Sequence, residues 1–157
     1  MADRESVQRW VDGYVAAWRT AGTDGLETLF TDDATYLHSP YAEPVVGLAR
    51  IRAMWDDDRD GPNEVFTINT DIIAVDGDTA VVRALVRYGD PVRQEYSDLW
   101  VLRLNERMQC TSFEEWPLWP GLHWSARQAD EDWQLAHRMP NGPPGPPPGG
   151  STTVVTQ

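Results

Sequence analysis

The sequence predicts an α+β protein in which helices cover one face of an antiparallel sheet. In the first third of the chain, apolar residues recur with the spacing of helices. From Glu64 onward they alternate with polar residues at a period of two, and turn residues separate the alternating segments. Helices and strands that are segregated in this way along a chain give an α+β fold.

The first helix is predicted by an apolar stripe of large side chains. Asp3 precedes this stripe as an N-cap, and Gly22 follows it as the end of the helix. The stripe has the 3.6-residue period of one helix face and comprises Val7, Trp10, Val11, Tyr14, Val15 and Trp18.

Two shorter helices and one strand are expected next. Asp24 and Glu27 form a capping-box pattern ahead of a short second helix. Residues 34–38 have the composition of a strand. Gly47 precedes a third helix, which should end in the acidic run at residues 56–58.

Four long strands are expected in the second half of the chain. They cover residues 65–75, 79–88, 93–104 and 108–116, with turns at 76–78, 89–91 and 105–107. Three consecutive hairpins make an antiparallel meander, and Pro117 and Pro120 end it.

Composition excludes several classes of function. The chain has 157 residues, which suits one domain, and its 25 acidic and 13 basic side chains give a net charge of −12. We therefore expect no nucleic-acid partner and no membrane partner, because phosphate binding depends on clustered cations. All 13 basic residues are Arg, which excludes a Schiff-base or P-loop lysine. The single cysteine, Cys110, excludes a cysteine-cluster metal site.

The chain is expected to be cytoplasmic and to carry a disordered tail. No signal peptide and no run of 18 apolar residues is present. Residues 139–157 are rich in Pro and Gly and lack charge, so we expect the domain to span 1–138 and the tail 139–157. The tail either solubilises the protein or binds an aromatic groove of a partner.

The segment from Thr31 to His38 (TDDATYLH), which follows an amphipathic helix and a short one, resembles the NTF2-like superfamily. Within it, the chain is most similar to the SnoaL-like and ketosteroid-isomerase-like branch, over about residues 5–120. The resemblance implies a cone, in which three N-terminal helices pack on a curved antiparallel sheet that encloses a cavity. Members of the superfamily include isomerases, cyclases, dehydratases, epoxide hydrolases and non-catalytic binding modules.

The resemblance also implies catalytic residues. Ketosteroid isomerases place a tyrosine on the first helix and an aspartate base near the end of the first strand. Tyr14 matches the tyrosine, and His38 falls at the position of the base. The third position of the family, a protonated acid, falls at Trp100 unless Asp98 takes its role. An imidazole serves as a base at neutral pH without large tuning of its pKa.

The lining of the cavity is predicted from strand alternation. Tyr96, Asp98 and Trp100 share one face of the strand at 93–104. Burial would raise the pKa of Asp98, or a partner such as His38 would keep it ionised. The candidate substrate-binding residues, for which core packing is the alternative role, are Trp18, Tyr36, Trp55, Tyr96, Trp100 and Trp116.

Two functions remain open from the sequence. The first is a cofactor-independent enzyme with His38, Tyr14 and Asp98 as catalytic residues, acting on a small apolar oxygenated molecule. The second is a non-catalytic module that binds a small molecule or a protein. We expect no metal site, because the three histidines are far apart in the sequence. We also expect a homodimer through the outer sheet face, with apolar residues Val81, Leu85, Leu99, Val101 and Phe113.

Overall fold

The computed structural model describes residues 2–59, 61 and 63–120. Its helices and strands lie in one compact unit, Met1–Leu118. In chain order they are α1 (Arg4–Arg19), α2 (Leu26–Leu29), β1 (Phe30–Leu37), β2 (Val45–Val46), α3 (Leu48–Asp58), β3 (Phe66–Asp76), β4 (Thr79–Tyr88), β5 (Gln94–Leu104) and β6 (Cys110–Leu118). The predicted α+β class is confirmed. The predicted tail at 139–157 and the end of the predicted domain lie outside the described residues.

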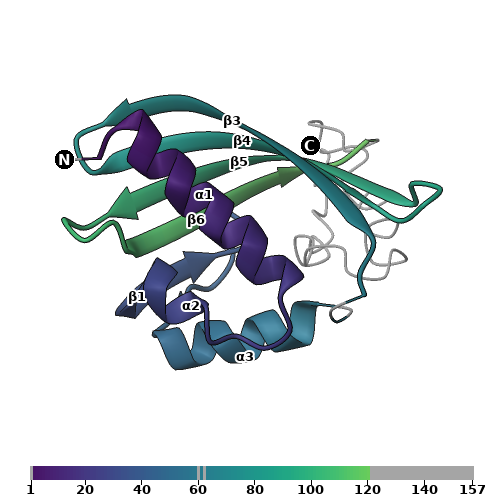
Figure 1. Ribbon diagram of the computed structural model, residues 1–157, viewed down its shortest axis with the longest axis horizontal. Coiled ribbons are helices and arrows are strands. Elements are labelled where there is room, and N and C mark those ends of the chain that lie inside the picture. Colours follow the sequence, from purple (N-terminus) through teal and green to yellow (C-terminus); the bar gives the residue numbers. More distant parts are fainter. Residues whose placement is uncertain (1, 60, 62, 121–157) are drawn as a thin grey trace, which may run out of the picture. The chain divides into compact units, whose positions relative to one another are not determined.

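The six strands form one sheet in the order β2-β1-β6-β5-β4-β3. Strands β3 to β6 are the expected antiparallel meander, and α1 runs across one face of these curved strands (Figure 1). The expectation of a wholly antiparallel sheet is wrong, because β1 pairs with β6 in parallel. The chain leaves β1 through α3 and three hairpins before it returns beside it, so this pair is not constrained by a tight turn to run antiparallel.

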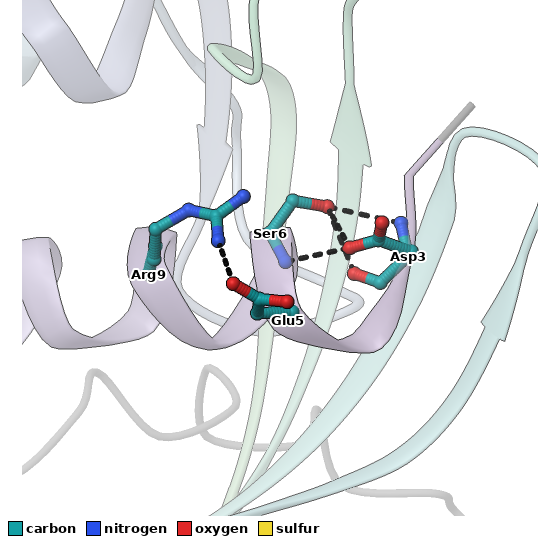
Figure 2. Close-up of polar contacts among 4 residues, drawn as sticks. All are labelled: Asp3, Glu5, Ser6 and Arg9. Atoms are coloured by element: carbon teal, nitrogen blue, oxygen red, sulfur yellow. Dashed lines mark hydrogen bonds and ion pairs between the residues drawn. The ribbon is translucent and has the colours of Figure 1, made fainter.

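Helix α1 begins with a capping box, which Figure 2 shows in close-up. The Asp3 carboxylate accepts a hydrogen bond from the backbone N–H of Ser6 at 2.7 Å, and the Ser6 hydroxyl oxygen accepts one from the N–H of Asp3 at 3.0 Å. These bonds satisfy backbone groups that a helix end leaves without partners. The N-cap predicted at Asp3 is therefore confirmed.

Helix α2 differs from its prediction. It has only four residues, its N-cap is Gly25, and no side chain caps it, so the capping box of Asp24 and Glu27 does not form. The buried Phe30 ends the helix and opens β1, which therefore begins four residues earlier than predicted. In contrast, α3 begins directly after Gly47, as expected.

The core lies between α1 and the inner face of the sheet. The apolar stripe of α1, with Val7, Trp10, Val11 and Tyr14, is buried there. Tyr14 stacks on Phe113 of β6, with ring centroids 5.3 Å apart. Burial of aromatic side chains on this scale is a dominant stabilising contribution in a domain of this size.

A β-bulge in β6 decides which of its side chains reach this core. Leu104 pairs with Cys110 and Arg103 with Ser112, so Thr111 is an extra residue in the strand. One extra residue moves every following side chain to the other face. Phe113 is consequently opposite Leu102 and fully buried, which corrects our expectation that it lies on the outer face.

Within the described part of the chain, no helix is long and apolar enough to cross a membrane.

Candidate functional site

A largely buried chain of hydrogen bonds links helix α1 to strand β6. The hydroxyl groups of Tyr14 on α1 and Tyr36 on β1 are 2.8 Å apart. Tyr36 in turn donates a hydrogen bond of 2.7 Å to Oε1 of Glu115 on β6. The parallel pairing of β1 with β6 brings Tyr36 and Glu115 together, because Tyr36 is in register with Phe113 and Leu37 with Glu114.

His38 lies at the other side of the same carboxylate, one residue beyond the end of β1. Its Nδ1 is 3.9 Å from Oε2 of Glu115, and its Nε2 is 3.7 Å from Oδ2 of Asp58 at the end of α3. The Nε2 atom also contacts Sδ of Met54 at 2.8 Å. The side chain of His38 is 26% exposed, so the imidazole sits at the boundary between the interior and solvent.

Burial holds this imidazole toward its neutral form. Desolvation lowers the pKa of His38 below its ordinary value of 6.5, while the charge of Asp58 acts in the opposite direction. A histidine is a base only when it is neutral. His38 is therefore in the form that can accept a proton at neutral pH.

The two interior carboxyl groups are held toward their protonated forms. Burial and the charge of Asp98 raise the pKa of Glu115 to about 8, with the hydrogen bond from Tyr36 opposing. Burial raises the pKa of Asp98 to about 7. Among the described residues, no arginine lies within ion-pair distance of either carboxylate to offset its desolvation.

The two tyrosine hydroxyls also keep their protons. Desolvation, followed by the charge of Glu115, raises the pKa of both Tyr14 and Tyr36 well above the ordinary value of 10.0. Both therefore remain hydrogen-bond donors across the physiological pH range.

Among the buried polar groups of the described residues that have no hydrogen-bond partner, three lie around Tyr14. They are Oδ1 of Asp98 and the indole N–H groups of Trp55 and Trp100. The Trp100 indole lies close enough to Asp98 to oppose the rise in its pKa, but no hydrogen bond of normal geometry joins them. Unpartnered polar groups are costly in a protein interior, and each of these could bind a polar atom of a ligand.

The structure brings most of the predicted lining residues together around Tyr14. The rings of Trp55 and Trp100 lie 5.0 Å and 4.9 Å from the Tyr14 ring. Trp18 packs edge-on against Trp55 at 4.8 Å and donates a hydrogen bond to Glu64 at 2.9 Å.

Two of the predicted lining residues lie apart from this cluster. Tyr96 lies near the start of β5, where it receives a hydrogen bond from Gln94 and packs against Tyr88. Trp116 is 49% exposed and pairs with the exposed Leu99, so it lies on the outer face of the sheet.

Sequence reasoning missed the two carboxylates that flank His38. Within the described residues the ion-pair distances give His38 the neighbours Glu115 and Asp58, and not Asp98. Glu115 is in register with Trp100 across the hairpin, but this could be known only with the bulge at Thr111 in place. Asp58 belongs to an acidic run that is typical of a solvated helix end.

The cavity implied by the resemblance stays a prediction. A surface depression of about 560 Å³ is lined by residues of β1 and of the β5–β6 turn, including Asp32 and Arg107, and by none of the predicted site residues. In residues 2–59, 61 and 63–120, no group of three or more His, Cys, Asp or Glu side chains is arranged to hold a metal ion.

The fold and the site together define a class of protein, in which a helix covers a curved sheet and titratable side chains gather on the inner face of that sheet. The SnoaL-like domain model matches residues 11–108, and the chain belongs to that family. No curated protein matches the sequence.

Solved structures share the fold at low sequence identity. The epoxide hydrolase/cyclase-like enzyme SalBIII of salinomycin pyran ring formation superposes with a TM-score of 0.61 and 18% identity, over 75% of this chain and 95% of that chain. An NTF2-like protein of unknown function from Burkholderia xenovorans gives 0.59 and 12%, over 80% and 92%. The CaMKII hub of S. rosetta gives 0.55 and 18%, over 75% and 99%. Other matched structures have ketosteroid isomerase-like folds. The predicted NTF2-like and SnoaL-like membership is confirmed.

Proposed function

We propose that this protein is a cofactor-independent enzyme that performs acid/base chemistry on a small, largely apolar, oxygenated molecule. One observation carries the proposal: a neutral imidazole, two carboxyl groups with pKa values of about 7 and 8, and two phenols gather on the inner face of the sheet. Titratable groups tuned toward neutrality are typical of proton-transfer sites.

Each polar group has a role that fits its surroundings. His38 accepts a proton from the substrate, and the charge of the neighbouring Asp58 stabilises the imidazolium that forms. Tyr14 donates a hydrogen bond to the oxygen on which negative charge develops. Asp98 returns the proton as an acid, since burial keeps it protonated up to a pH of about 7.

These roles support isomerisation, aldol-type cyclisation, dehydration or epoxide opening. The substrate would lie against the Trp55 and Trp100 rings, and its polar atoms would meet their free N–H groups. The matched SalBIII is described as epoxide hydrolase/cyclase-like, and the reaction classes proposed here include that chemistry.

A non-catalytic binding or association module is the second candidate function. The outer face of the sheet favours it, because Leu99, Trp116 and Leu118 are exposed there on neighbouring strands. A matched structure of this fold is the hub of CaMKII. We propose a homodimer through this face, which is compatible with either function.

Native mass spectrometry of the full chain with bound metabolites, followed by turnover assays on the molecules found, tests the proposal. With a substrate in hand, His38→Ala should lower kcat by about 10²- to 10⁴-fold and leave ligand affinity within about tenfold, because a base acts chiefly in the transition state. Asp98→Asn should lower kcat as well. Glu114→Gln, on the outer face of the same strand, is the control and should keep full activity. Unchanged kcat in His38→Ala would leave the binding module as the function.

A further inference from the structure

We propose that Glu115 is a positioning residue that controls, through Tyr36, whether Tyr14 has a hydroxyl proton to offer a ligand. When Glu115 is protonated, the Tyr14 proton is free for a carbonyl or enolate oxygen. When Glu115 is ionised, the chain of hydrogen bonds reverses, so Tyr14 donates to Tyr36 and can only accept a hydrogen bond from a ligand. The inference rests on the proposed function in one respect, namely that the ligand lies against Tyr14.

The reversal follows from counting protons. Each phenol has one O–H and therefore donates one hydrogen bond. With Glu115 ionised, the Tyr36 proton goes to Oε1 of Glu115 at 2.7 Å. The contact of 2.8 Å between the two hydroxyls then needs the Tyr14 proton, because Tyr36 has none left. Tyr14 also approaches Glu115 closely enough to stabilise its charge, and this interaction draws the same proton away from a ligand.

Protonated Glu115 has one good acceptor for its own proton. Oε1 lies 2.7 Å from the Tyr36 hydroxyl, whereas Oε2 lies 3.9 Å from Nδ1 of His38, which is too far for a hydrogen bond. The carboxylic proton is therefore carried by Oε1, which donates a hydrogen bond to the Tyr36 hydroxyl. Tyr36 then donates to Tyr14, and the Tyr14 proton is released.

The charges around Glu115 place the reversal of the hydrogen bonds near neutral pH. Asp98 faces it from β5, Asp58 from α3, and His38 from the end of β1, while Tyr14 and Tyr36 supply hydrogen bonds from α1 and β1. Burial and the two acids favour the protonated form, and the phenols favour the ionised form. The resulting pKa of about 8 means that small changes of pH or of ligand charge shift the donor state of Tyr14.

Infrared spectroscopy of the ligand-free full chain tests the reversal directly. Between about pH 6 and pH 10, the carboxylic C=O band of Glu115, identified by its loss in E115Q, should disappear with a midpoint near 8. The C–O stretch of Tyr14, identified by its loss in Y14F, should shift with the same midpoint. The shift should be absent in E115Q, and E114Q should behave as wild type. A Tyr14 band that stays fixed while Glu115 titrates, or that still shifts in E115Q, would overturn the proposal.

Binding of an apolar ketone tests the consequence for the ligand. With 2-acetylnaphthalene as the probe and tryptophan fluorescence as the signal, wild-type affinity should fall about tenfold as pH rises through the Glu115 titration, the loss of about one hydrogen bond. E115Q, which has no carboxyl to titrate at this position, should bind with no such dependence. The same pH dependence in both proteins would contradict the proposal. If the ketone binds at no pH, the proposed function is contradicted, and the infrared result still decides the proton switch.

Discussion

Four successive residues of β6 show that the same kinds of side chain have different exposure and different partners on the two faces of the sheet. Phe113 and Glu115 belong to the inner face, and Glu114 and Trp116 to the outer face. Phe113 has 0% exposure, whereas Trp116 has 49%. Glu115 is hydrogen-bonded to a buried tyrosine and lies beside His38, whereas Glu114 accepts a hydrogen bond of 2.9 Å from the exposed Trp116 indole.

The difference teaches that residue type alone does not mark this site. An aromatic ring and a glutamate occur on each face, and only the inner pair meets other buried aromatic and titratable groups. Desolvation then converts an ordinary carboxylate into one that holds its proton near neutral pH. The outer pair serves as a set of matched controls for the inner one.

The largest effect that tests this comparison is the loss of an aromatic ring from each face. Phe113→Ala should lower the free energy of unfolding by about 3–5 kcal/mol, since it leaves a cavity among Tyr14, Tyr36 and Trp100. Trp116→Ala should change it by about 0.5 kcal/mol or less. Urea unfolding of both variants measures the difference, and equal losses would refute the assignment of faces.

The second effect is the pH dependence of stability. The pKa of Glu115 in the folded protein, about 8, lies above its ordinary value of 4.5, so the folded state binds this proton more tightly. The stabilisation is complete below the ordinary value and is lost as pH rises through 8. Between about pH 5 and pH 8, the free energy of unfolding should fall by at least about 1.4 kcal/mol, which corresponds to one pKa unit.

Neutral variants of the two glutamates isolate the cause of that slope. Glu115→Gln should flatten the pH dependence, although a part remains, because burial raises the pKa of Asp98 to about 7 in the same direction. Glu114→Gln should leave the slope unchanged. A wild-type slope in Glu115→Gln would show that the Glu115 carboxyl is ionised throughout this pH range.

Local patterns predicted much of this fold, and long-range pairing accounts for what they missed. The range of β4 was predicted without error, because a turn bounds it on each side and its side chains alternate. The parallel pairing of β1 with β6 depends on residues far apart in the chain, so no local pattern indicates it. The placement of Phe113 failed for one reason, the extra residue Thr111, which lies in a strand that otherwise alternates regularly.

The candidate site was predictable to a similar extent. Tyr14, Tyr36, Trp55 and Trp100 do meet, since helical and strand periods place each on a buried face. Glu115 could not be found in this way, because its face depends on the bulge. Asp58 could not either, because its approach to His38 depends on how α3 packs beside β1.

The smallest effect on stability is expected from a substitution on the outer face, which should instead change the oligomeric state. Leu99 is exposed and lies in register with Trp116, so the two form the centre of an apolar strip on β5 and β6. Leu99→Arg should leave the free energy of unfolding within about 0.5 kcal/mol, because a long side chain at an exposed position displaces no core atom.

If the strip joins two copies, the new charges meet across the two-fold axis without partners, and the dimer should dissociate. Light scattering at tens of micromolar should then report a dimer for the wild type and a monomer for Leu99→Arg. Glu114→Gln, beside the same strip, should remain a dimer. A wild-type protein that is monomeric at this concentration would refute the homodimer and leave the strip to a different partner.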